Sequence, residues 1–215
     1  MVRTSFYAGL LGLSLLASPA QAVTISLIAS PSPVTSGQTV MIDIVASGFT
    51  SGQFVSAFDL GIDFDPAQLG FVADSFRVGS ALGSVMDVDY FDFTDASGAD
   101  AGELLPFVVS LLSDPLLAGL QPGPTVTLGS FELLARRTGV ALTSDVGLSC
   151  NSVAGPLDEQ QNAILLPIDG CSGSSIAIEP VAAPEPGTLA LLGLGLLGLA
   201  ALQRGRRGGA RTRRT

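Results

Sequence analysis

Histidine, tryptophan and lysine are all missing from this chain of 215 residues, so its ten basic residues are all arginine. Without histidine, the chain cannot supply a Ser-His-Asp or Cys-His catalytic apparatus, nor a zinc or haem site that needs an imidazole ligand. Without lysine, it cannot supply a P-loop lysine, a Schiff base or a pyridoxal phosphate site. The composition therefore excludes many common catalytic classes, and we expect a protein that is not an enzyme.

Positive charge is scarce in the body of the chain and abundant at its end. Residues 23–186 contain all nineteen acidic residues and three arginines, a net charge of −16, whereas the last twelve residues contain six arginines. A body with this charge repels phosphate backbones, so nucleic acid is not expected as a partner. The charge instead favours solubility, attraction of cations and resistance to aggregation.

The N-terminus has the pattern of a secretory signal peptide. Arg3 supplies a positive charge, an apolar run follows from Phe6 to Ala17, and Ala20-Gln21-Ala22 places small residues before the cut. The run is too short to span a bilayer, and a buried N-terminal helix, the alternative, would not need this ending. We expect residues 1–22 to be a signal helix that signal peptidase removes after Ala22, and hence an exported protein.

A second apolar run, Thr188–Leu202, lies between a proline-rich segment and a cluster of arginines. As a helix it would extend about 22 Å, and flanking residues or a thinner bilayer would cover the rest of the roughly 30 Å hydrocarbon core. The arginines behind it hold that end in the cytoplasm by the positive-inside rule. We therefore expect a transmembrane helix with the body of the protein on the outer side, in agreement with the signal peptide.

This tail, residues 182–215, resembles the PEP-CTERM sorting signal of Gram-negative bacteria in all three of its parts. Pro184-Glu185-Pro186 matches the tripeptide, Gly187 begins the usual continuation, and the basic stop is formed by Arg204, Arg206 and Arg207. The resemblance implies that an exosortase, a membrane cysteine transpeptidase-like enzyme, removes the helix and the arginines near the tripeptide. It also implies transient anchoring in the inner membrane, then residence at the cell surface or in an extracellular matrix. An ordinary C-terminal membrane anchor is the alternative.

Between these ends, residues 23–181 have a length that fits one domain, and their alternation of apolar and polar residues predicts β-strands. In 38–47 one face carries Val40, Ile42, Ile44 and Ala46, and in 56–64 one face carries Phe58, Leu60, Ile62 and Phe64. In 125–134 the alternation changes phase at Gly129-Ser130, which predicts a β-bulge.

Weaker strand patterns fill most of the remaining body. They cover 24–29, 69–78, 86–94, 105–112, 140–149 and 174–181, and a loop or short helix is expected near 114–120. About eight or nine strands separated by turn residues predict an all-β fold, a two-sheet β-sandwich.

One part of the body resembles a known domain. The turn Asp65-Pro66-Ala67-Gln68-Leu69-Gly70-Phe71 after an alternating strand, and the later strand 128–133, resemble the cohesin-like domains of the carbohydrate-binding-module superfamily. The resemblance implies a jelly-roll or cohesin-like sandwich. Cohesins of cellulosomes bind dockerins through one sheet face, but this chain has a single copy and no dockerin-like calcium repeat, so a cellulosome role is not implied. The partner, protein or exopolysaccharide, stays open.

Cys150 and Cys171 are the only cysteines, and 20 residues separate them. A single pair in an exported chain predicts a disulfide, which would close a segment containing residues 155–161, and we expect these residues to form an exposed loop. A reactive thiol or a metal pair is the alternative, and the absence of histidine disfavours it.

Carboxylates are dense between residues 87 and 100, where Asp87, Asp89 and Asp92 are candidate Ca²⁺ ligands. Their spacing does not match an EF-hand, and we favour a solvated strand face and loop. We therefore expect no cofactor, with calcium as the open alternative.

Two acids placed close together could in principle hydrolyse a glycosidic bond. Sugar sites usually stack their substrate on aromatic rings, yet the chain has only two tyrosines, and its eleven phenylalanines are expected mostly in the core. The main hypothesis is a non-enzymatic surface or matrix protein with a structural, adhesive or protein-binding role. A carbohydrate-binding module that recognises exopolysaccharide is the second hypothesis, and an acidic hydrolase is the third.

Overall fold

The structure, a computed structural model, describes residues 22–136 and 139–181. Contacts divide the chain into two units, Met1–Pro180 and Val181–Thr215, and the folded residues described here belong to the first. The expected signal helix and the expected transmembrane helix both lie outside the described residues. Within the described ranges, no helix is long and apolar enough to cross a membrane.

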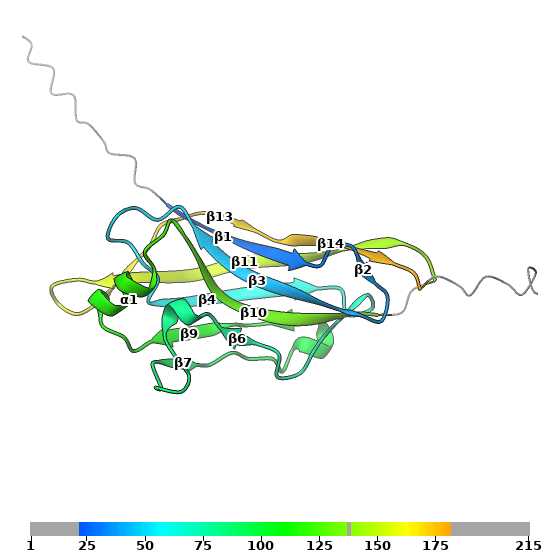
Figure 1. Ribbon diagram of the computed structural model, residues 1–215, viewed down its shortest axis with the longest axis horizontal. Helices are drawn as coiled ribbons and strands as arrows, with labels where there is room; N and C mark the ends of the chain where they lie inside the picture. The colour runs from blue at the N-terminus through cyan, green and yellow to red at the C-terminus, as the bar shows by residue number, and fades with distance from the viewer. Residues whose placement is uncertain (1–21, 137–138, 182–215) are drawn as a thin grey trace, which may run out of the picture. The chain divides into compact units, whose positions relative to one another are not determined.

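The described residues form two β-sheets that pack face to face, as Figure 1 shows. The six-stranded sheet has the order β13-β1-β3-β10-β5, with β6 also paired to β10. The β1–β13 pair is parallel, whereas β3 lies antiparallel between β1 and β10. The bounds of these strands are β1 Val23–Ser30, β3 Thr39–Ser47, β5 Leu69–Phe71, β6 Arg77–Val78, β10 Thr125–Ala135 and β13 Ile168–Ser172.

The eight-stranded sheet has the order β2-β14-β11-β4-β9-β7, with β12 paired to β11 and β8 paired to β4. Its strands are β2 Val34–Thr35, β4 Ala57–Phe64, β7 Tyr90–Asp92, β8 Glu103–Leu104, β9 Phe107–Ser110, β11 Leu142–Leu157, β12 Ala163–Leu165 and β14 Ser174–Glu179. One α-helix, α1 (Asp114–Leu120), follows β9, and short 3₁₀ helices cover Ser80–Leu82 and Ala99–Ala101.

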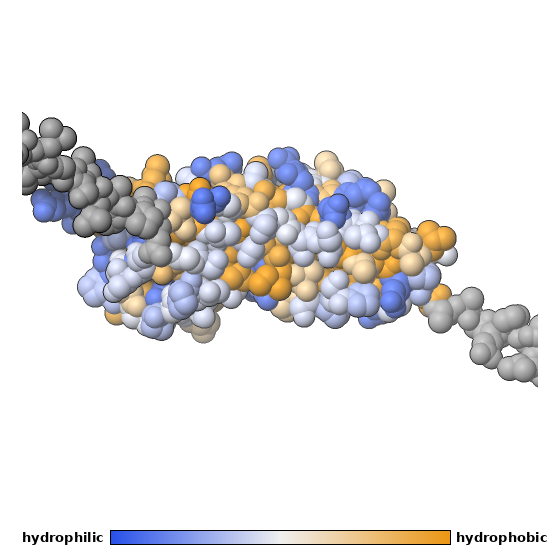
Figure 2. All heavy atoms as spheres, turned by 90° about the horizontal axis from the view of Figure 1, so that it is seen from above, coloured by the Kyte–Doolittle hydropathy of each residue, from blue (hydrophilic) through white to orange (hydrophobic). Residues whose placement is uncertain are grey.

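The core lies between the two sheets, and the predicted alternation builds it. Every inward residue named for 38–47 and 56–64 is buried, while Thr39, Met41 and Asp63 on the opposite parity are exposed. On the side of the sandwich seen in Figure 2, apolar and polar residues are mixed, as is usual for sheets whose outer side chains meet water. The all-β, two-sheet prediction is therefore confirmed.

The phase change in β10 is also confirmed as a β-bulge. The register against β3 shifts between Thr127 and Gly129, so that Leu128 and Gly129 are buried one after the other. The extra residue returns Phe131 and Leu133 to the inward face, and both are buried.

Several strand boundaries differ from the prediction because turns interrupt the longer segments. Within 69–78, Asp74 has a φ of 57°, and the chain forms two short strands, β5 and β6. Within 86–94 only Tyr90–Asp92 is strand, because residues 84–89 form a turn closed by the Asp89 amide on the Ser84 carbonyl. The helix expected near 114–120 is present as α1.

The largest difference lies in β11, which continues from Leu142 to Leu157, so residues 155–157 belong to a strand rather than to an exposed loop. The chain turns only afterwards, where the Asp158 carboxylate accepts hydrogen bonds from the amides of Gln160 and Asn162. These bonds lower the pKa of Asp158 below its usual range, the Asn162 amide having the larger effect.

Candidate binding face and sorting signal

Most of the predicted processing residues lie outside the described residues. They are Ala20 of the signal cleavage site, the motif Pro184, Glu185, Pro186 and Gly187, and the stop residues Arg204, Arg206 and Arg207. The described fold ends with β14 at Glu179, so the motif follows the last strand within a few residues.

The predicted disulfide is confirmed: Cys150 is bonded to Cys171. Cys150 lies in β11 of the eight-stranded sheet and Cys171 in β13, the edge strand of the other sheet. The bond therefore joins the two sheets covalently. Both cysteines are used, and no free cysteine remains in the chain.

Three of the acidic residues between 87 and 100 accept hydrogen bonds from backbone amides of their own turns. Asp89 accepts a hydrogen bond from the Ser84 amide at 2.9 Å, and Asp92 accepts one from the Thr94 amide at 2.9 Å. Asp95 accepts the Ser97 amide, and this bond lowers the pKa of its carboxyl. Among the described residues, no three acidic or cysteine side chains converge as a metal site would require, so Asp87, Asp89 and Asp92 are not brought together as calcium ligands.

Most of the described phenylalanines are buried or packed against the core, as expected, but three are exposed. Phe91 is 49% exposed, Phe93 is 56% exposed and Phe107 is 41% exposed. Their rings form a row, with centroids 5.9 Å apart for Phe91 and Phe93 and 5.5 Å apart for Phe93 and Phe107. We call these three residues the aromatic cluster.

The aromatic cluster arises from strand pairing at the edge of the eight-stranded sheet. Phe91 lies in the edge strand β7 opposite Val109 of β9, and the Phe93 amide donates to the Phe107 carbonyl at 2.8 Å. Tyr90, on the other parity of β7, packs against the core, and this burial raises the pKa of its hydroxyl. Because Tyr90 and Phe91 are both aromatic, the sequence alone does not show which parity faces outward.

Polar groups continue the outward face beside the aromatic cluster. Asp59 of β4 pairs with Phe107 across the sheet, and its carboxylate accepts a hydrogen bond from the Asn151 amide group at 3.0 Å. At Gly61 a Cβ atom would lie 2.5 Å from the Ser149 hydroxyl oxygen. Glycine therefore leaves room for the Ser149 hydroxyl, which donates to the Gly61 carbonyl. The face therefore combines exposed aromatic area with carboxylate and hydroxyl groups.

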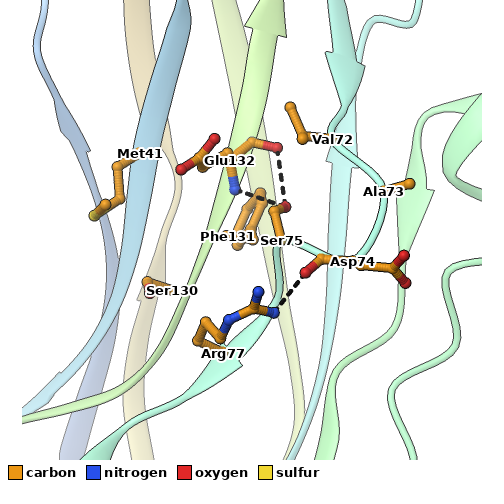
Figure 3. A pocket seen from close by; sticks show the side chains of 9 residues that line it. All are labelled: Met41, Val72, Ala73, Asp74, Ser75, Arg77, Ser130, Phe131 and Glu132. Carbon is orange, nitrogen blue, oxygen red and sulfur yellow. Dashed lines mark hydrogen bonds between the residues drawn. The ribbon is translucent and has the colours of Figure 1, made fainter.

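A hollow of about 280 Å³ lies at the other sheet, beside β10 and the loop after β5 (Figure 3). Arg77 donates to the backbone carbonyls of Asp74 and Phe76, and the Ser75 hydroxyl accepts the Glu132 amide at 3.0 Å. In Figure 3 the carboxylates of Asp74 and Glu132 point away from each other. The hollow thus lacks the facing carboxylate pair that glycoside hydrolysis uses.

Comparison with known proteins gives a match at the C-terminal end. A family described as the PEP-CTERM protein-sorting motif matches residues 182–207, which include the tripeptide and the first three arginines of the stop. A comparison with curated protein sequences found no match.

Solved structures resemble the sandwich. A type II cohesin domain from the cellulosome of Acetivibrio cellulolyticus shares 16% identity, covering 73% of this chain and 95% of its own, with a TM-score of 0.51. A type II cohesin–X–dockerin complex from the same organism gives 15% identity, coverages of 73% and 99%, and a TM-score of 0.55. A type I cohesin–dockerin complex from Clostridium thermocellum gives 14% identity, coverages of 75% and 96%, and a TM-score of 0.51.

At these identities the likeness shows the fold alone. The chain has a cohesin-like β-sandwich and ends in a PEP-CTERM protein-sorting motif.

Proposed function

We propose that this protein is an exported, non-catalytic surface or matrix protein whose sandwich binds another protein. The matched sorting motif at 182–207 carries the proposal, because it implies processing by an exosortase on the outer side of the membrane. In this account residues 1–22 are removed by signal peptidase, residues 23–181 form the functional domain, and residues 182–215 are the sorting signal of a Gram-negative bacterium.

The chemistry of the tail supports the order of these steps. The arginines after Leu202 stop translocation, and the apolar run anchors the chain in the inner membrane. We expect Pro184 and Pro186 to favour an extended backbone, since proline disfavours helical conformation in the residue before it and lacks an amide donor. Exosortase would therefore meet an accessible extended segment just outside the bilayer.

The protein-binding role is supported by the fold and by the aromatic cluster. Two of the similar solved structures are complexes of a cohesin with a dockerin. In this chain, exposed aromatic rings beside Asp59 and Asn151 provide the apolar area with polar neighbours that is common in protein interfaces. We assign the binding surface to this outward face of the eight-stranded sheet.

The sorting step is tested by changing the tripeptide in the native host. A variant with Pro184→Ala, Glu185→Ala and Pro186→Ala should keep its C-terminal tail and accumulate in the inner-membrane fraction, while the wild-type protein reaches the cell surface. Pro180→Ala, just outside the matched segment, is the control and should be sorted normally. Full-length wild-type protein in the cytoplasm would overturn the proposal.

The aromatic cluster also favours a second candidate, a carbohydrate-binding module, because aromatic rings in a row can stack on sugar rings. A glycan array with residues 23–181 separates the two. Binding to a matrix polysaccharide that is lost in Phe93→Ala would favour the second candidate, and absence of binding would favour a protein partner.

A further inference from the structure

A second exposed apolar surface surrounds α1 and contains none of the aromatic cluster. It is a groove of about 470 Å³ lined by Leu112, Pro115, Leu116, Gly119 and Leu120, with Asp87 and Asp89 beside them. We call it the α1 groove.

The side chains around the α1 groove are unusually exposed for apolar residues. Among the residues that line it, Leu116 is 57% exposed and Leu120 is 47% exposed. Val85, Met86, Val88 and Leu111, which are sequence neighbours of lining residues, are also exposed by nearly half or more. Scattered exposed apolar residues need no explanation, but two exposed leucines that line one hollow, with further exposed apolar residues next to its lining in the sequence, indicate an interaction site.

The groove is held open by contacts on the inner side of α1. Leu117 is buried, and the side chain of Gln121 donates to the carbonyls of Val55 at 2.8 Å and Ala81 at 3.0 Å, while its oxygen accepts the Val55 amide at 2.8 Å. These bonds fix the C-terminal end of the helix against the body, so Leu116 and Leu120 stay on the outside. A preformed groove loses little conformational entropy on binding.

Charge decides between the possible occupants. Neither described arginine, Arg77 or Arg136, lines the groove, whereas Asp87 and Asp89 do line it, beside its apolar residues. A second copy of this chain would bring four carboxylates together, and an anionic lipid surface would repel a body of net charge −16. A cationic partner is favoured on both counts.

We propose that the α1 groove binds an amphipathic segment of a partner protein, whose leucine-like side chains enter the groove while its lysine or arginine side chains reach Asp87 and Asp89. Such a segment follows the helix-in-groove mode of recognition. The sequence continues into the sorting motif after β14, whose end lies at the opposite end of the sandwich from α1 (Figure 1). The groove thus lies far from the point where the sandwich is attached.

The test uses residues 23–181, which contain both sheets and the whole core, and a short helical peptide with leucine on one face and lysine on the other. Binding is measured by fluorescence anisotropy and mapped by NMR amide shifts. We expect Leu116→Ser with Leu120→Ser to weaken binding by about tenfold or more, and Asp87→Asn to weaken it and reduce its salt dependence. Leu134→Ser and Asp169→Asn, exposed on the other sheet, are the matched controls and should bind as the wild type does.

Two altered peptides make the result specific. Replacing the lysines by glutamate, or the leucines by serine, should each abolish binding, since the proposal needs both features. Equal binding by the groove variants and the controls would contradict it, because the peptide would then respond only to net charge. Self-association of the domain, or binding to anionic vesicles that Leu116→Ser abolishes, would replace the proposed occupant by another and so also overturn it.

Discussion

At the scale of single residues, Gln121 shows how one side chain substitutes for missing strand pairing. Gln121 is buried. Its side-chain oxygen accepts a hydrogen bond from the Val55 amide, and its side-chain nitrogen donates one to the Val55 carbonyl, as the backbone of a paired strand would do. Val55 lies just before β4, where no strand of the sheet is paired with it. A polar residue is thus retained in the core because it satisfies backbone groups that would otherwise be buried without partners.

Replacing Gln121 by alanine should lower the free energy of unfolding by roughly 2–4 kcal/mol, because the amide and carbonyl of Val55 and the carbonyl of Ala81 lose their partner. Denaturant unfolding of residues 23–181 measures the change. Gln160→Ala, on an exposed turn, should stay within about 0.5 kcal/mol of the wild type. Equal stability of the two variants would contradict the role given to Gln121.

At the scale of elements, the disulfide between β11 and β13 is a side-chain cross-link between the two sheets, in addition to the backbone connections. It restrains β13, an edge strand that is paired on one side by β1. We expect the disulfide to act mainly by lowering the conformational entropy of the unfolded chain. The folded sandwich should keep its core without the bond.

The double variant Cys150→Ala with Cys171→Ala should fold with the same sheets but with a free energy of unfolding lower by about 3 kcal/mol, the chain-entropy value for a loop of this length. Denaturant unfolding measures this difference. Adding a reductant should destabilise the wild type by a similar amount and leave the double variant unchanged. A stable wild type under full reduction would show that the bond contributes little.

The elements also show what the sequence could predict and why the rest escaped. Strands β3 and β4 have one buried face, so clean alternation marks them, and the parity change in 125–134 marks the bulge of β10. The strands β2, β6 and β8 have two residues each, which is too short for any period to show. The aromatic cluster escaped because burial of one parity of β7 depends on where its neighbours pack, and both parities are aromatic.

The two surfaces around the eight-stranded sheet could not be predicted for a related reason. Leu116 and Leu120 read as ordinary helical core residues, and only the inward position of Leu117 and the contacts of Gln121 turn them outward. By contrast, the sorting motif depends on local sequence alone. The sequence was therefore sufficient to recognise this motif, which the family comparison matched at 182–207.

At the scale of the whole molecule, charge and apolar runs are separated along the chain. The acidic body contains a cohesin-like sandwich with exposed apolar surfaces, and the arginines that would hold the tail inside the cell come after the apolar run. In the proposed function, such a chain would carry its anionic domain to the outside and then be cut from its own anchor. The account therefore depends on two cuts, one at each end of the sandwich.

Mass spectrometry of the intact protein purified from the native host, with fragmentation to locate both termini, tests this claim most directly. The account predicts a chain that begins at Val23, ends near Pro184-Glu185-Pro186 and is lighter by the hydrogen atoms lost when Cys150 and Cys171 bond. A surface protein that still begins at Met1, or that still contains the arginines after Leu202, would contradict it.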